Sequence, residues 1–99
     1  MDPVLVYYRE LWHQIHYKAA ESNYQEERQE YCVWIRNIIK SLDCPVCKVH
    51  AIEYLRNNPP ELCQNLFIWT WNFHNDVNQR LDKPIVDYMT AVKIYISSI

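Results

Sequence analysis

Residues 62–81, LCQNLFIWTWNFHNDVNQRL, carry the most regular apolar pattern in the chain. The apolar side chains that recur along this stretch are Leu62, Leu66, Trp69, Phe73, Val77 and Leu81. A spacing of three or four residues places them on one face of a helix, whereas a strand would alternate at every residue. The stretch therefore predicts a long helix packed against other helices.

Capping residues before this stretch predict two earlier helices. Asp2 followed by proline suits the start of a first helix, which runs to about Ala19, because the carboxylate caps and the proline fills the first helical position. Ser22 and Gln25 have the spacing of a capping box, which predicts the start of a second helix ending near Leu42.

Prolines mark the remaining boundaries. Pro45 suits the first turn of a third helix because it lacks an N–H and fixes φ, and the sequence NNPP at 57–60 ends that helix. After an interruption at 82–84, apolar side chains at helical spacing predict a fifth helix from Ile85 to Ile99.

The composition limits the class of protein. Glycine is absent from the 99 residues, although average usage would give about seven. Rossmann domains, P-loops and most β-sandwiches need glycine at positive φ, so they are excluded. The net charge is −2, no basic run suggests nucleic acid as a partner, and no apolar stretch approaches the ~20 residues that span a membrane. We expect one all-α domain over residues 1–99, a compact bundle of four to five helices.

The pair Cys44 and Cys47 falls in the first turn of the predicted third helix. Unpaired backbone N–H groups there favour negative charge, so they stabilise a thiolate. A thiolate is both the nucleophile of disulfide exchange and a metal ligand, so redox and zinc functions stay open. A zinc-binding interaction module without catalytic activity would add His50 and either Cys63 or His74 as ligands.

Two predicted helices carry a mixed aromatic and polar face. On the fourth helix its members are Trp71, His74, Asn75 and Asn78. On the first helix they are Arg9, Trp12 and His16. A solvated polar face accounts for the asparagines but not for Trp71. Two such faces in one bundle suit a flat aromatic cofactor.

Three blocks carry a resemblance to a known family: RELWHQIH at 9–16, CPVCKVHAIEYLRNNP at 44–59 and WTWNFHNDVNQRLDKP at 69–84. The chain resembles the Erv/ALR flavin-dependent sulfhydryl oxidases, in particular the short forms encoded by large DNA viruses. The resemblance implies a helical bundle that encloses FAD, usually as a homodimer. It also implies an enzyme that converts two substrate thiols into a disulfide and dioxygen into hydrogen peroxide.

The resemblance also implies residue roles. Cys44 would exchange with the substrate, and Cys47 would lie nearer the flavin. The cofactor contacts that it implies are Arg9, Trp12, His16, Trp71, His74, Asn75, Val77, Asn78, Lys83 and Tyr95. Among these, Lys83 would lie near cofactor phosphate. No metal is implied.

The chain departs from the family pattern at several positions. Asp82 stands where the family commonly has glycine, which predicts either a strained turn or an altered phosphate contact. Trp71 and Tyr88 stand where longer cellular relatives have a structural cysteine pair, so packing is expected to replace that crosslink. Cys32 and Cys63 match no family cysteine. We expect each to be a small buried apolar side chain, with a bond between them, or across a dimer, left open.

The second, shuttle cysteine pair of the longer relatives is not visible in this sequence. The resemblance therefore suggests that a small thioredoxin-like relay protein brings electrons to the core pair. Resemblance to viral forms, with no signal sequence or membrane helix recognised, places the expected protein in the cytoplasm of an infected cell or in the virion, rather than in the mitochondrial intermembrane space.

Overall fold

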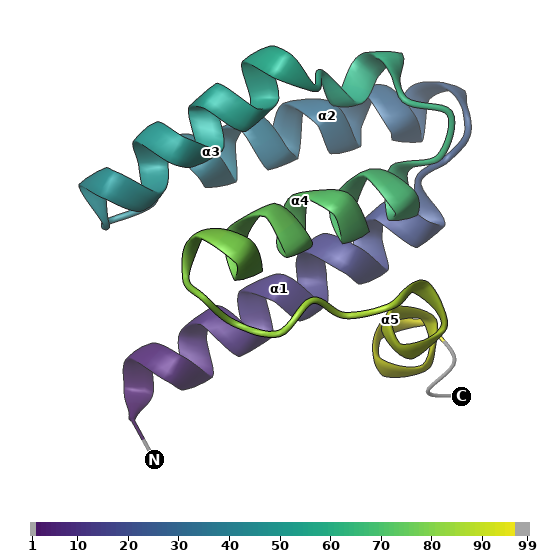
Figure 1. Cartoon of the computed structure of the whole chain (residues 1–99). Helices are drawn as coiled ribbons and strands as arrows, with labels where there is room; N and C mark the ends of the chain where they lie inside the picture. The colour runs from purple at the N-terminus through teal and green to yellow at the C-terminus, as the bar shows by residue number, and fades with distance from the viewer. Residues whose placement is uncertain (1, 97–99) are drawn as a thin grey trace.

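The computed structural model describes residues 2–96, and this part of the chain folds into five α-helices and one short 3₁₀ helix (Figure 1). They are α1 (Pro3–Glu21), α2 (Gln25–Lys40), α3 (Pro45–Asn57), η1 (Pro60–Leu62), α4 (Leu66–Arg80) and α5 (Tyr88–Tyr95). No strand occurs within residues 2–96. The prediction of an all-α bundle is confirmed.

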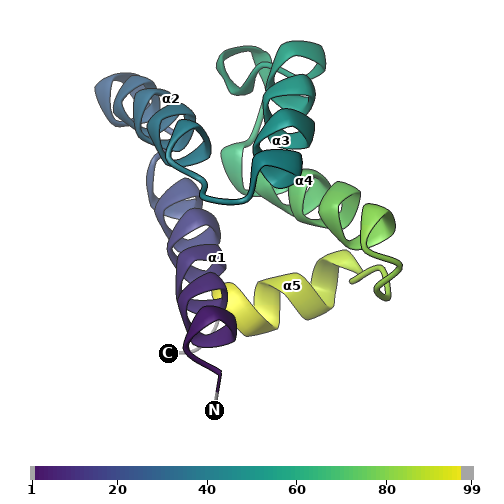
Figure 2. The ribbon, with the colours of Figure 1, turned by 90° about the vertical axis from the view of Figure 1, so that its left-hand side faces the viewer.

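The helices pack as two pairs with a crossing fifth helix. α1 lies against α4 and α2 against α3, while α1 also contacts α2 and α5. Figure 1 views α1 and α4 from the side and α5 along its axis, and Figure 2 shows α5 running across the bundle. This arrangement brings α1, α4 and α5 together on one side of the molecule.

One continuous apolar core joins the two helix pairs. Its buried members are Ile15, Ala19, Tyr31, Cys32, Ile35, Ile39, Ala51, Leu55, Leu66, Trp69 and Phe73. The polar atoms that come inside with the aromatic rings are paired: the Tyr31 hydroxyl donates to the Ile15 carbonyl at 2.8 Å, and Trp69 Nε1 donates to the Asn58 carbonyl at 2.7 Å. Burying each large apolar side chain stabilises the fold by about 1.5–3 kcal/mol.

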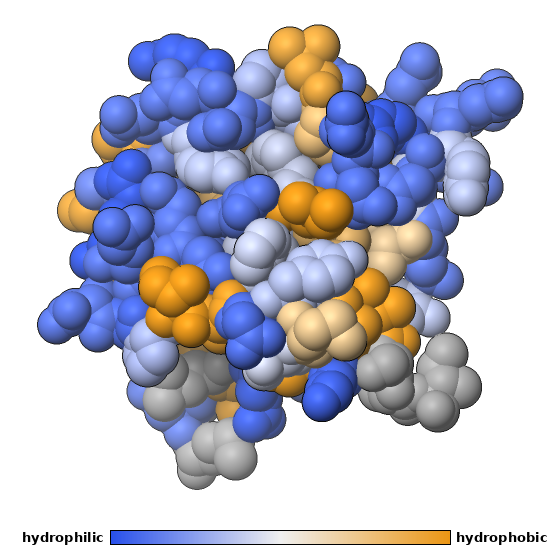
Figure 3. All heavy atoms as spheres, turned by 45° about the vertical axis from the view of Figure 1, so that its right-hand side comes forward, coloured by the Kyte–Doolittle hydropathy of each residue, from blue (hydrophilic) through white to orange (hydrophobic). Residues whose placement is uncertain are grey.

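On the face in Figure 3, apolar side chains form separate groups among polar ones.

Two helix starts follow the sequence prediction. The Asp2 carboxylate accepts a hydrogen bond of 2.9 Å from the Val4 N–H at the start of α1. α3 begins with Pro45 at its first position, preceded by Cys44 as the N-cap. The cysteine pair therefore lies at a helix N-terminus, as the sequence indicated.

Three predicted boundaries are wrong. Ser22 ends α1, because its N–H donates to the Ala19 carbonyl, and α2 begins at Gln25 without a capping side chain. Leu62 lies in η1 and is 81% exposed, so it does not belong to the core face of α4. α5 begins at Tyr88 instead of Ile85; the last residue of the predicted helix, Ile99, lies outside the described part.

Local capping explains where α4 and α5 begin. The Asn65 side chain accepts from the Ile68 N–H at 3.1 Å and so fixes the first turn of α4. The Asp87 side chain accepts from the Thr90 N–H at 2.9 Å and does the same for α5. In both cases a capping side chain, and not the apolar pattern, sets the boundary.

The end of α4 adopts the backbone that the sequence predicted for Asp82. Its φ is 56°, a left-handed conformation that favours glycine. The Asp82 N–H donates to the Gln79 carbonyl at 3.2 Å, and the Lys83 N–H donates to the Asn78 carbonyl at 2.8 Å. This pair of bonds is a Schellman motif, which ends the helix and directs the following segment back across the bundle.

Candidate functional site

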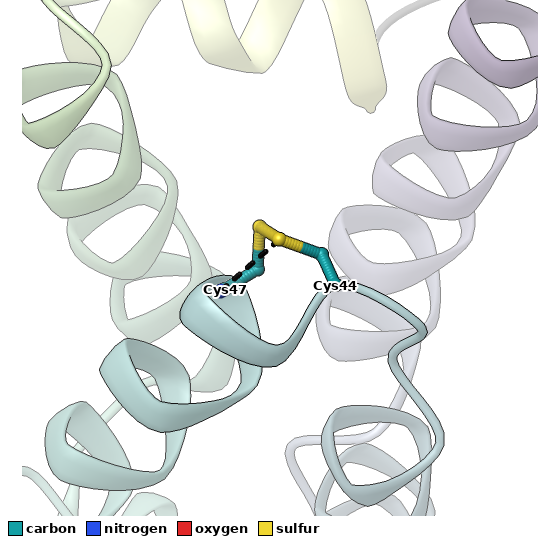
Figure 4. The surroundings of a disulfide bond; sticks show 2 residues. All are labelled: Cys44 and Cys47. Carbon is teal, nitrogen blue, oxygen red and sulfur yellow. Dashed lines mark hydrogen bonds between the residues drawn. A yellow bond between two sulfur atoms is a disulfide. The ribbon is translucent and has the colours of Figure 1, made fainter.

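Cys44 and Cys47 form a disulfide across the first turn of α3, with their Cα atoms 5.2 Å apart. The Cys44 sulfur also accepts from the Cys47 N–H at 3.3 Å. Figure 4 shows the sulfur atoms projecting from the start of α3, away from the rest of that helix. Cys44 is half-buried and Cys47 exposed, with exposed Pro45 and Val46 between them, so another molecule can reach the disulfide.

The position of this disulfide favours its reduction to a reactive dithiol. When the bond opens, the helix N-terminus supplies unpaired N–H groups that stabilise a thiolate. The Cys47 N–H already points at the Cys44 sulfur. A thiolate is the leaving and attacking species of thiol–disulfide exchange, so the pair is suited to accept and release electrons two at a time.

The zinc alternative finds no ligand set in the structure. Within residues 2–96, no three His, Cys, Asp or Glu side chains gather in a way that could hold a metal. Cys44 and Cys47 are bonded to each other, and His74 is hydrogen bonded to His16. One candidate fourth ligand, His74, is therefore committed elsewhere, and the other, Cys63, has the Arg28 guanidinium 3.4 Å from its sulfur.

A cluster of aromatic rings joins α1, α4 and α5. The rings of Trp12 and His74 are parallel within 2°, with their centroids 3.7 Å apart. The ring of His16 stacks on Tyr95 at 4.0 Å, and His16 also lies 5.1 Å from His74. Four of the predicted cofactor contacts are thus brought together from three helices.

A hydrogen-bond chain fixes the proton positions in this cluster. The Thr70 hydroxyl donates to the Phe67 carbonyl at 2.6 Å, so its oxygen accepts from His16 Nδ1 at 2.9 Å. A neutral His16 with its proton on Nδ1 accepts at Nε2, where His74 Nδ1 donates at 2.8 Å. The chain therefore leaves His74 Nε2 as a hydrogen-bond acceptor.

Both histidines are neutral at physiological pH. Burial, reinforced by the nearby His74 and His13, lowers the pKa of His16 to about 3. Burial, reinforced by the charge of Lys83, lowers the pKa of His74 to about 4. Desolvation disfavours the charged imidazolium in both cases, so the hydrogen-bond chain keeps its direction over the physiological range.

A second group of predicted residues holds the segment that leads into α5. Asn75 donates from Nδ2 to the Val86 carbonyl at 2.8 Å and accepts from the Val86 N–H at 3.0 Å. Trp71 Nε1 donates to the same carbonyl at 2.8 Å, and Asn78 Nδ2 donates to Asn75 Oδ1 at 3.2 Å. These side chains clamp one residue of the connecting segment, and so they position α5 and Tyr95.

Trp71 and Tyr88 pack against each other, as expected for the two positions where longer relatives have a structural cysteine pair. Their rings meet edge to face with centroids 5.5 Å apart. Such contacts contribute about 0.5–1.5 kcal/mol beyond area burial. The two residues therefore connect α4 to α5 without a crosslink.

The remaining predicted contacts lie around the cluster. Arg9 is exposed on α1, one turn before Trp12. Val77 packs against the core, so its side chain belongs partly to the fold. Lys83 is exposed after the turn at Asp82, near enough for its charge to act on His74.

Sequence reasoning missed two residues of this site. Thr70 is fully buried and starts the hydrogen-bond chain, but it lies one position before the mixed face, and only its polarity within an apolar run could have signalled it. Val86 contributes only its backbone, so its type carries no signal.

The residue types of this region fit a flat, polar-edged cofactor such as FAD. Parallel rings, a neutral imidazole acceptor, the Asn78 carboxamide and a lysine cation are present, while the Asn75 carboxamide is bonded to Val86. On α3, one turn after Cys47, the Nδ1 atom of His50 is buried and has no hydrogen-bond partner among the described residues. The cavity inside the cluster, lined by Trp71, His74 and Tyr95 among others, measures only about 10 Å³. The side chains of the cluster themselves fill the space between the helices.

Comparison with known proteins gives a consistent set of relatives. The sequence model of the Erv1 / Alr family matches residues 9–96. A protein named FAD-linked sulfhydryl oxidase, from a Kenyan pig isolate of African swine fever virus, is 37% identical over 94 residues, which cover 90% of this chain and 79% of that protein. A protein of the same name from a Malawian tick isolate is 37% identical and covers 90% of this chain and 79% of its own length. Another from a Namibian warthog isolate is 38% identical and covers 89% of this chain and 78% of its own length.

Within residues 2–96, no helix is long and apolar enough to span a membrane.

Proposed function

Because the chain belongs to the Erv1 / Alr family, we propose that it is a FAD-linked sulfhydryl oxidase that forms disulfides in protein substrates. The observation that carries the proposal is the Cys44–Cys47 disulfide at the N-terminus of α3. It combines an oxidised pair, access from outside and a helix end that stabilises the thiolate.

In the first step a substrate thiolate attacks the Cys44 sulfur and forms a mixed disulfide, and Cys47 leaves as a thiolate. The second substrate thiol then displaces Cys44, so the substrate holds a new disulfide and the enzyme a dithiol. Two protons and two electrons have moved from the substrate to the enzyme. The N–H groups at the start of α3 stabilise each leaving thiolate.

FAD, when bound, supplies the acceptor for this electron pair and the route to dioxygen, which becomes hydrogen peroxide. We assign its binding to the aromatic cluster and the residues around it. The proposed contacts are Arg9, Trp12, His16, Trp71, His74, Asn75, Val77, Asn78, Lys83 and Tyr95. Cys47 is the sulfur that we place nearer the flavin, as membership of the Erv1 / Alr family implies.

The chain's own residues prepare this site in two ways. His74 Nε2 is held as an acceptor by the chain from Thr70 through His16, so it suits a donor group of a cofactor. Because the enclosed space is only about 10 Å³, the stacked side chains have to move apart to admit a flavin ring. Aromatic planes then remain as stacking surfaces.

The proposal extends to partners and setting. Residues 1–99 act as one sulfhydryl oxidase domain that functions as a homodimer. A thioredoxin-like relay protein delivers substrate electrons to Cys44. The relatives are viral, which supports a place in disulfide formation in the infected cell or the virion.

Matched cysteine variants test this function. Replacing Cys47 by Ala should leave FAD bound, seen in the visible spectrum, but abolish oxygen uptake with dithiothreitol. Cys63→Ala serves as the control, because Cys63 lies outside the pair and should leave turnover intact. Turnover by Cys47→Ala would overturn the role of this pair.

A further inference from the structure

Cys32 and Cys63 are free thiols that lie on facing segments of the bundle. Cys32 is buried on α2, as expected from the sequence. Cys63 follows η1 and is half-buried, so the prediction that it is a buried apolar side chain on a helix is wrong. It lines a surface cleft of about 440 Å³, together with Tyr54, Leu62, Ile68 and Trp69.

The face of α2 that meets this region contains Arg28, Cys32 and Arg36, each one turn apart. Arg28 Nη2 donates to the Cys63 carbonyl and lies 3.4 Å from both the Pro60 carbonyl oxygen and the Cys63 sulfur. Arg36 binds Glu61 through two bonds of 2.9 and 2.7 Å. The two arginines fasten α2 to both ends of the 60–63 segment.

Cys32 lies between these two attachments, on the side of α2 that faces the segment. Leu62 is exposed, so its neighbours Glu61 and Cys63 are the residues that turn toward α2. Burial raises the pKa of the Cys32 thiol, and Glu61 and Cys63 raise it further, which places Cys63 near Cys32. The two thiols differ: Cys63 is accessible and has a guanidinium beside its sulfur, whereas Cys32 is enclosed.

We propose that Cys32 and Cys63 are a second redox pair, which disulfide exchange converts into a bond between α2 and the 60–63 segment. Cys63 is the attacking sulfur, because it is the more accessible of the two and Arg28 Nη2 lies 3.4 Å from it. Its thiolate opens an external disulfide, one half of which bonds to Cys63 while the other leaves as a thiol. Cys32 then displaces the first half as a second thiol, so two electrons and two protons pass to the external disulfide.

The oxidant is itself a disulfide, either of low molecular weight or the Cys44–Cys47 bond of another copy. The new bond closes a loop that contains all of α3, so it constrains the helix that carries Cys44 and Cys47. Oxidation of the second pair should therefore stabilise the bundle, because a crosslink restricts the unfolded chain.

Oxidised glutathione tests the pair on the full chain. The protein is reduced, incubated with oxidised glutathione and alkylated, and its intact mass and cysteine-containing peptides are then measured. We expect a peptide pair linked through Cys32 and Cys63, with no glutathione retained, and a melting temperature several degrees above that of the reduced protein. Free Cys32 and Cys63, glutathione retained on Cys63, or a Cys63–Cys63 link between two chains would overturn the proposal.

Two variants sharpen the test. Cys32→Ser removes the displacing thiol, so glutathione should stay on Cys63 as a stable adduct; an unmodified Cys63 would refute its role as the attacking sulfur. Arg28→Gln should slow the modification of Cys63 severalfold, whereas the matched Arg36→Gln, which contacts Glu61 instead of sulfur, should not. Equal rates of Cys63 modification in the two variants would show that Arg28 does not assist the attack by Cys63. None of these measurements requires FAD or turnover, so their failure is distinguishable from failure of the oxidase function.

Discussion

Replacing Thr70 by Val tests the hydrogen-bond chain at the centre of the candidate site. The Thr70 hydroxyl is fully buried, donates to the Phe67 carbonyl and accepts from His16 Nδ1. Valine has nearly the same shape but no hydroxyl, so it leaves His16 Nδ1 without a partner at a residue that is 1% exposed. An unsatisfied buried polar atom costs about 1–3 kcal/mol.

We therefore expect urea denaturation to show that Thr70→Val loses about 1–3 kcal/mol of unfolding free energy. Nitrogen NMR shifts of the imidazoles should show that the fixed protonation of His16 on Nδ1 is lost. Thr70→Ser is the matched control, because it keeps the hydroxyl and loses only a methyl, at a cost of about 0.8 kcal/mol. Its imidazole shifts should match those of the original chain.

The reasoning would be refuted by a valine variant with unchanged stability and unchanged imidazole shifts. That result would mean that Thr70 does not set the histidine protonation. A loss of stability in both variants with unchanged shifts would reduce Thr70 to a packing residue.

Three further predictions follow from the geometry. In the folded chain His16 and His74 have pKa values of about 3 and 4, so both stay neutral until the pH is well below neutrality. In the unfolded chain they bind protons below about pH 6.5. The stability that the folded chain has above pH 6.5 should therefore be lost as the pH falls toward 4. Chemical denaturation at several pH values measures this loss, which His16→Gln should reduce; a flat profile between pH 6.5 and 4 would contradict it. Asp82→Gly relieves the left-handed φ of 56° and should raise the unfolding free energy by up to about 1 kcal/mol in urea denaturation, and a loss would argue against strain. Asn75→Ala removes both bonds to Val86, so hydrogen exchange in α5 should accelerate while that in α2 stays the same; uniform protection would show that the clamp is unimportant.

The sequence was sufficient for the fold because the helical signals agree with one another. Asp2, Pro45 and the apolar stripe of α4 each have the predicted place. The glycine-free composition excluded the folds that need positive φ, and the strain at Asp82 was predicted because the family that the chain resembles commonly has glycine there. Local chemistry determines these features, so a sequence reveals them.

The errors occurred at helix boundaries, where alternative local hydrogen bonds compete. The spacing of Ser22 and Gln25 fits a capping box, but Ser22 instead bonds to Ala19 and closes the previous helix. Leu62 fits the stripe of α4, yet the prolines before it form a separate 3₁₀ turn. Spacing identifies residues on one face but does not say where a helix stops.

The candidate site was partly predictable for a similar reason. Helical spacing placed Trp12, His16 and His74 on faces that could meet, and the structure brings them together with Tyr95. The link through Thr70 joins residues 54 positions apart, so it depends on how α1 packs against α4.

The most direct test of the oxidase account is the visible absorption spectrum of the purified protein, followed by oxygen uptake on addition of dithiothreitol. The account predicts a flavin absorption band and oxygen consumption that depends on Cys44 and Cys47. A colourless protein that binds no added FAD and consumes no oxygen would contradict it.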